Sequence, residues 1–139
     1  MKHHVTTKWL GKMAFESTNP AGTLKIDASP EDGGEGNGLR PKALMLSAVA
    51  GCSGLDVASL IRKMKLEVDD FVIETDAELT DEHPKYYSEV TIDYHFHGPA
   101  LDEKKLQRAV DLSVEKYCGV MEMFRHFAKI NIRTFFHGK

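Results

Sequence analysis

Two cysteines, Cys52 and Cys118, are the residues in this chain best suited to covalent chemistry. Each is joined to a glycine, in Gly51-Cys52 and Cys118-Gly119, and each falls within or beside an expected helix. A thiol becomes a nucleophile when cations, hydrogen-bond donors or a helix N-terminus stabilise its thiolate. The two residues therefore predict a working thiol pair, as in a small redox protein.

The cysteines also allow a simpler interpretation, because free cysteine is among the most buried residue types. Both would then be inert core residues of an assembly domain. Asp56 lies one turn after Cys52 on the same helix face, where its charge would disfavour a Cys52 thiolate. Arg40 and Lys42 precede Cys52 by roughly 15 to 18 Å along a continuous helix. Either cation could therefore serve Cys52 only through a helix break or a partner subunit.

The composition is that of an ordinary water-soluble globular protein. The chain has 139 residues, of which 42% are hydrophobic and 28% charged, with a formal net charge of -3. We therefore expect one domain over residues 1–139. The only dense cationic run, at residues 62–65, is too short to hold a nucleic-acid backbone, so we expect no nucleic-acid partner.

The longest nearly apolar run, residues 43–52, is about half of what a bilayer-spanning helix needs. No charged-then-apolar leader opens the sequence. We expect a cytoplasmic protein with no membrane partner. Reducing pools keep cytosolic thiols free, so any bridge between the cysteines should be transient.

The first part of the chain predicts a small β-meander followed by a loop and a long helix. The expected strands are residues 5–10, 13–18 and 23–27. Residues 28–38 are rich in glycine and have no apolar periodicity, so they predict a surface loop rather than a domain linker. Residues 41–65 open with proline, end with cations and predict a central helix whose first half is deeply buried.

The second part predicts a hairpin, two helices and a closing strand. Residues 71–79 and 90–96 alternate apolar and polar side chains and predict antiparallel strands. Asp102 can cap a helix that ends near Cys118-Gly119, and a short helix over residues 120–129 follows. Residues 130–136 again alternate apolar and polar side chains and predict the closing strand. The expected fold class is therefore α+β.

Two segments carry a resemblance to a known family. Residues 38–57 read GLRPKALMLSAVAGCSGLDV and residues 109–118 read AVDLSVEKYC. These segments, with both cysteines and this order of elements, resemble the OsmC family of osmotically inducible protein C and organic hydroperoxide resistance proteins. The resemblance covers nearly the whole chain. It implies an α+β homodimer whose chains intertwine around buried central helices, with active sites at the subunit interface.

The resemblance also implies roles for the two thiols. Cys52 would attack an organic hydroperoxide and become a sulfenic acid, and Cys118 would capture it as a disulfide that a dithiol then reduces. The reversible disulfide protects the first thiol from irreversible over-oxidation. No cofactor and no metal is expected.

The sequence departs from the peroxidase pattern at two places. Lys42 and Ala43 stand where the family carries a glutamate, and the hairpin arginine that activates the thiolate has no counterpart between Phe15 and Gly22. Arg40 is the candidate substitute. An alternative hypothesis is a non-catalytic OsmC-like dimer that binds a small apolar ligand or responds to redox state.

His95 and His97 alternate on one strand face and are the only histidines placed to share a metal ion. No further ligand clusters beside them, so we expect both to face solvent. His126 lies two turns beyond Cys118, too far for a Cys-His pair.

Overall fold

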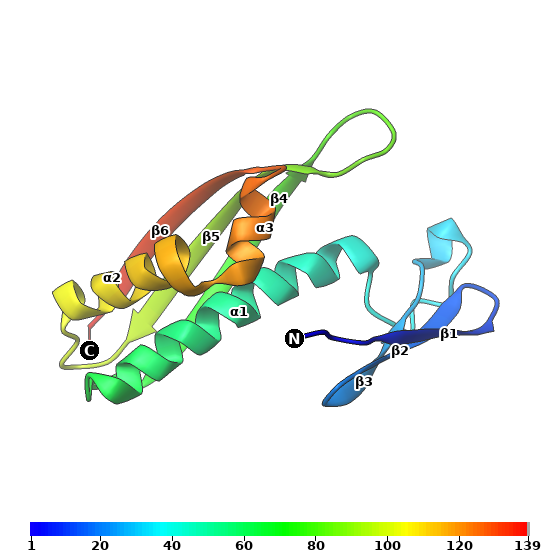
Figure 1. The fold of residues 1–139 in the computed structure, drawn as a ribbon. Coiled ribbons are helices and arrows are strands. Elements are labelled where there is room, and N and C mark those ends of the chain that lie inside the picture. Colours follow the sequence, from blue (N-terminus) through cyan, green and yellow to red (C-terminus); the bar gives the residue numbers. More distant parts are fainter. Residues whose placement is uncertain (139) are drawn as a thin grey trace. The chain divides into compact units, whose positions relative to one another are not determined.

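A computed structural model describes residues 1–138. The chain forms two compact units, Met1–Met45 and a larger unit that begins at Leu46, and Figure 1 shows their elements. The expectation of one domain over residues 1–139 stays a prediction. The α+β fold class is confirmed, with two three-stranded sheets and three α-helices within the described residues.

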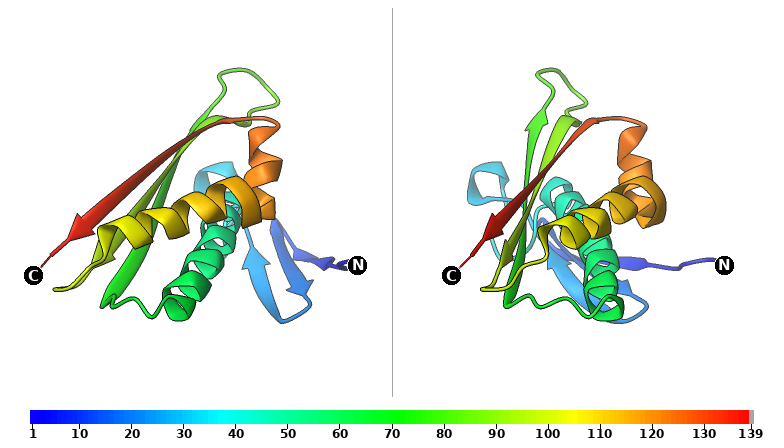
Figure 2. Two further views of the ribbon diagram at one scale, coloured as in Figure 1. Left: turned by 60° about the vertical axis from the view of Figure 1, so that its left-hand side comes forward. Right: turned by 90° about the vertical axis from the view of Figure 1, so that its left-hand side faces the viewer.

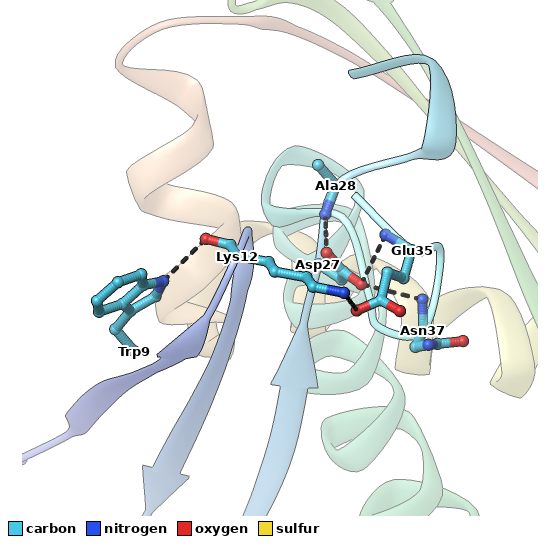
Figure 3. Close-up of polar contacts among 6 residues, drawn as sticks. All are labelled: Trp9, Lys12, Asp27, Ala28, Glu35 and Asn37. Carbon is cyan, nitrogen blue, oxygen red and sulfur yellow. Dashed lines mark hydrogen bonds and ion pairs between the residues drawn. The ribbon is translucent and has the colours of Figure 1, made fainter. Parts of the chain in front are cut away.

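The first unit is the predicted β-meander. Its strands are β1 (Thr6–Gly11), β2 (Ala14–Asn19) and β3 (Gly22–Ile26). They pair antiparallel in the order β1-β2-β3, which confirms the prediction to within one residue at each end. The indole N–H of Trp9 donates to the carbonyl of Lys12 at 2.9 Å and closes the first turn (Figure 3).

The glycine-rich loop after β3 is organised by the buried carboxylate of Asp27 (Figure 3). This carboxylate accepts backbone N–H bonds from Ala28 at 2.8 Å and from Glu35 and Asn37 at 3.2 Å. Burial acts to raise the pKa of Asp27, but these donors and the charge of Lys25 outweigh it, and the pKa is lowered. A surface loop was predicted; its anchoring by a carboxylate was not.

The helix α1 (Pro41–Lys63) matches the predicted central helix and ends two residues earlier. Only one face of it is buried within the chain, by Val49, Ser53 and Val57. The expected deep burial of its first half is therefore not found within a single chain. By length and composition α1 could cross a membrane, but core helices pass the same test, and its buried face packs into the core.

The second unit contains a sheet in the order β4-β5-β6. The strands β4 (Asp70–Leu79) and β5 (Tyr87–His97) form the predicted antiparallel hairpin. The closing strand β6 (Lys129–His137) pairs parallel to β5, which requires a long crossover. The helices between β5 and β6 supply that crossover.

The first of the two predicted crossover helices, which was expected to run from Asp102 to near Cys118, is divided at Ser113. The helix α2 (Glu103–Leu112) begins at the predicted cap, where Asp102 accepts the backbone N–H of Lys105 at 3.1 Å. A π-helical turn, η2 (Ser113–Tyr117), then leads to Cys118, and α3 (Gly119–Arg125) follows. π-Helical turns are rare and frequently occur at functional sites.

The three helices cover one face of the second sheet (Figure 2). The buried face of β5 carries Val90, Ile92, Tyr94 and Phe96. Against it pack Val49 and Val57 of α1, Leu106, Ala109 and Val110 of α2, and Met121 and Phe124 of α3. Cys118 belongs to this core, and Cys52 packs against it.

Candidate functional site

Cys52 and Cys118 are neighbours in the folded chain. Cys52 is half-buried in the middle of α1, whereas Cys118 is only 4% exposed at the junction of η2 and α3. Burial raises the pKa of the Cys118 thiol to about 11, and the hydrogen bond and charge of Cys52 act in the same direction. The Cys118 thiol is therefore protonated at neutral pH, and it donates a hydrogen bond toward Cys52.

Backbone contacts fix the position of Cys118. Its N–H donates to the carbonyl of Ser113 at 2.8 Å, across the π-helical turn. Its sulfur accepts the backbone N–H of Met121 at 3.3 Å, as the N-cap of α3. This bond opposes the rise in the pKa of Cys118 but does not cancel it. The inner thiol is thus held toward Cys52.

A chain of side-chain hydrogen bonds lies beside the two thiols. The hydroxyl of Ser53 is 2.6 Å from that of Tyr94 and 2.7 Å from that of Ser113. Ser113 in turn donates to the carboxylate of Asp56 at 3.0 Å. The three hydroxyl residues are fully buried, whereas Asp56 is half-buried. We name these four residues the hydroxyl chain.

Charges in the hydroxyl chain and on the thiols shift one another's pKa values. Burial is the main reason that the pKa of Tyr94 is raised to about 12, and the bond from Ser53 acts against it. The charges of Cys118 and Asp56 raise the pKa of Tyr94 further. The phenol is therefore neutral at physiological pH and lies within electrostatic range of the inner thiol.

The outer end of the hydroxyl chain reaches a surface pocket. Asp56 lines a pocket of about 220 Å³ together with Ser59, Leu60, Lys63 and Tyr117. Tyr117 directly precedes Cys118, so this pocket lies at the outer side of the π-helical turn. Solvent can therefore reach the Asp56 carboxylate, whereas the hydroxyls of Ser113, Ser53 and Tyr94 are buried.

Arg40, the candidate activator, belongs to the first unit. Its guanidinium donates to the carbonyl of Gly38 at 2.7 Å and to that of Asp27 at 3.4 Å. With Met13, Phe15 and Ile26 it lines a separate pocket of about 310 Å³. Its role toward Cys52 stays a prediction.

The histidines of β5 have an additional neighbour that the sequence pattern did not reveal. Nδ1 of His95 lies 2.9 Å from Nε2 of His137 on β6, and the ring of His97 stacks on that of His137 at 4.4 Å. The parallel pairing of β5 and β6 brings these residues together. The rings stack rather than converge, and no group of three metal-ligating side chains occurs among residues 1–138.

One face of α1 remains open in the single chain. Ala48, Gly51, Leu55 and Ala58 recur at helical spacing along it and are exposed, with Leu55 at 75%. A Cβ atom added at Gly51 would meet nothing within 4 Å. We name these four residues the open ridge.

Sequence reasoning missed Ser53, Tyr94 and Ser113 as part of the site. Tyr94 and Ser113 fall within a predicted strand and a predicted helix, and both are fully buried in the folded chain. A buried tyrosine hydroxyl needs a partner, and Ser53 directly after Cys52 was the available signal. The second partner of Ser53, Ser113 on η2, could not be identified without the fold.

A family model described as OsmC-like protein matches residues 34–133. Protein YhfA of Escherichia coli strain K12 is 30% identical over 124 residues, which cover 88% of this chain and 90% of YhfA.

Two solved structures illustrate the structural similarity. A hypothetical protein from Aquifex aeolicus VF5 has 31% sequence identity and a TM-score of 0.88, and covers 100% of this chain and 98% of its own. An organic hydroperoxide resistance protein OsmC from Legionella pneumophila has 17% identity and a TM-score of 0.70, with 96% of each chain covered. At 17% identity, the likeness to the Legionella protein shows that the two chains share a fold.

Proposed function

This chain belongs to the OsmC-like protein family, and from that premise we propose that it is a thiol-dependent redox protein that reduces organic hydroperoxides. The observation that carries the proposal is the contact between a half-buried Cys52 and a buried, protonated Cys118. The likeness to the Legionella organic hydroperoxide resistance protein supports the choice of substrate class.

The first step forms a sulfenic acid. The Cys52 sulfur, as thiolate, attacks the terminal oxygen of the hydroperoxide, so that an S–O bond forms and the O–O bond breaks. The alkoxide leaves and takes up a proton to become an alcohol. Cys52 is assigned this step because it is the more exposed of the two sulfurs.

The second step forms the disulfide. The Cys118 sulfur gives up its proton and attacks the Cys52 sulfur, so that an S–S bond forms and the S–O bond breaks. The oxygen leaves as water, and an external dithiol later reduces the disulfide. The contact between the thiols in the reduced protein makes this step a short movement.

The active form in this proposal is a homodimer. The open ridge of α1 presents small residues and Leu55 at a spacing that allows a second helix to approach closely. A second copy seated there would bury the face of α1 that the single chain leaves open. Arg40 of either subunit is the cation assigned to the Cys52 thiolate.

The test measures hydroperoxide turnover with a small dithiol as the reductant. Wild-type protein should consume an organic hydroperoxide catalytically, and Cys52→Ser should lose that activity. Cys118→Ser should react once and then stop with a sulfenic acid that a carbon nucleophile traps. Turnover by Cys52→Ser equal to that of the wild type would refute the assignment.

A ligand-binding role is the second candidate, favoured by the pocket beside Arg40. Apolar side chains line that pocket together with the guanidinium of Arg40 and the carboxylates of Asp27 and Asp32, so that a small, mainly apolar ligand would find both apolar surface and polar groups there. On this hypothesis the chain binds such a ligand without turnover. Slow, non-saturable oxidation of the thiols by hydroperoxide would favour it over the peroxidase, and fast saturable turnover would exclude it.

A further inference from the structure

Ser113 contacts both of the segments that carry a cysteine. Its hydroxyl lies 2.7 Å from that of Ser53, which directly follows Cys52 on α1. Its carbonyl accepts the N–H of Cys118 at 2.8 Å across the π-helical turn. One fully buried residue therefore joins the backbone beside one sulfur to the backbone that carries the other.

The hydroxyl of Ser113 has a second partner on the same helix. It donates to the carboxylate of Asp56 at 3.0 Å, and a hydrogen bond to a charged acceptor is stronger than one between neutral groups. Because Ser53 and Asp56 are one turn apart, η2 is held against α1 at two points. We name these two contacts, together with the bond from Cys118 to Ser113, the serine clamp.

Removal of the Ser113 hydroxyl would break the clamp without stranding its partners. The Ser53 hydroxyl keeps its bond to Tyr94 at 2.6 Å. The Asp56 carboxylate is half-buried and lines the pocket of about 220 Å³, where water can solvate it. A buried polar group left without a partner is the costly case, and here no such group is created. Ser113→Ala is therefore a clean deletion of the clamp.

We propose that Ser113 is a positioning residue that holds the backbones of Cys52 and Cys118 at the separation their disulfide requires. This inference rests on the proposed function, because it concerns the same thiol pair. A disulfide forms without backbone movement only where the two Cα atoms lie within about 7 Å. The clamp joins the two segments in the reduced protein, so closure of the disulfide does not have to immobilise them.

The clamp should favour closure of the disulfide by exchange with a cyclic disulfide reagent. The protein dithiol gives two electrons and two protons to oxidised dithiothreitol. The S–S bond of the reagent breaks, and an S–S bond forms between Cys52 and Cys118. The products are the protein disulfide and reduced dithiothreitol. The equilibrium constant of this exchange measures how closely the fold presents the two thiols to each other.

The test measures that equilibrium constant. Protein is equilibrated at graded ratios of reduced to oxidised dithiothreitol, acid stops the exchange, and N-ethylmaleimide in denaturant labels the free thiols for counting by mass spectrometry. Ser113→Ala should lower the constant by on the order of 10-fold, because two hydrogen bonds between the segments are lost. A tenfold fall corresponds to a reduction potential about 30 mV higher for this two-electron couple.

The equilibrium constant separates positioning from general stability. It depends on the difference in stability between the oxidised and the reduced protein, so a change that destabilises both forms equally leaves it unaltered. A serine with a purely structural role would lower the melting temperatures of the two forms by the same amount. Ser113→Ala should instead lower the melting temperature of the oxidised form more than that of the reduced form.

Thr75→Val is the matched control, because it removes a buried hydroxyl that has no hydrogen-bond partner among the described residues. Its constant should equal that of the wild type. Circular dichroism checks folding. If Ser113→Ala does not fold, Asp56→Ala and Asp56→Asn carry the test, since both lack the charge but only the alanine lacks an acceptor for Ser113. The alanine variant should then have the lower constant, by roughly 3-fold.

The outcomes separate the serine clamp from the proposed function. An unchanged or higher constant in Ser113→Ala overturns the clamp and leaves the thiol pair standing, as do equal constants for the two Asp56 variants where those carry the test. If the constant falls as expected but the wild type consumes no organic hydroperoxide, the substrate is refuted and the clamp stands. If the wild type forms no disulfide at any ratio, both are refuted.

Discussion

Cys118 donates its hydrogen bond to Cys52 from a position that the backbone holds on both sides. Its N–H is bound to Ser113 at 2.8 Å, and its sulfur accepts from Met121 at 3.3 Å. Two sulfurs on different helices are thereby kept in contact before any oxidant arrives. The pair is asymmetric, with an outer thiol open to reagents and an inner thiol that holds its proton.

The asymmetry predicts selective alkylation. Iodoacetamide should label Cys52 first, because a pKa of about 11 leaves Cys118 with roughly 100-fold less thiolate at neutral pH than a cysteine of ordinary pKa 9.0. A raised pKa means that Cys118 labelling should increase as pH rises toward 11. Peptide mass spectrometry of the two cysteine peptides measures this. Equal labelling rates at neutral pH would contradict the asymmetry, and resistance of both thiols would favour inert core cysteines.

The buried carboxylate of Asp27 predicts a pH dependence of the loop after β3. Its folded pKa is lowered below 3.8, so its contribution to stability is present above the unfolded pKa and is lost as pH falls through the folded pKa. The N–H signals of Glu35 and Asn37 in NMR spectra should titrate with a midpoint below 3.8. Asp27→Asn is the control and should abolish the titration. A midpoint at or above 3.8 in the wild type would contradict the anchoring.

The open ridge predicts the effect of a charge at Leu55. If a second copy covers α1, Leu55→Glu buries an unpaired carboxylate and should raise the dimer dissociation constant by at least about 100-fold. Leu79→Glu is the matched control, because Leu79 is 45% exposed and lies on β4 rather than on the ridge. Analytical ultracentrifugation gives both constants. Equal values for the two variants would place the interface elsewhere.

Most of the fold could be predicted from local patterns. Strand-like runs between turn residues, and alternation of apolar residues in the second part, predicted five of the six strands to within one residue at each end, and the second strand of the hairpin to within three. Asp102 caps α2 as expected. The π-helical turn was missed because helical spacing continues through Ser113 and Tyr117 and hides the change of hydrogen-bond pattern. Pairing between strands distant in sequence, such as β5 with β6, has no local signal.

The candidate site could be predicted only in part. The family resemblance predicted the cysteine pair, and the fold places the two thiols in contact. The hydroxyl chain joins residues from α1, β5 and η2, so no single segment of the sequence contains it. Ser113 falls within the helix predicted from Asp102 to near Cys118, but its partners on α1 could not be predicted from that helix alone.

The most direct test of the central claim is the mass of each cysteine peptide after the reduced protein meets one equivalent of an organic hydroperoxide. The account predicts a disulfide between Cys52 and Cys118, seen as the loss of two hydrogens from the joined peptides. It also predicts that Cys118→Ser gains one oxygen on Cys52 instead. Two free thiols in the wild type, or oxygen added to Cys118 alone, would contradict it.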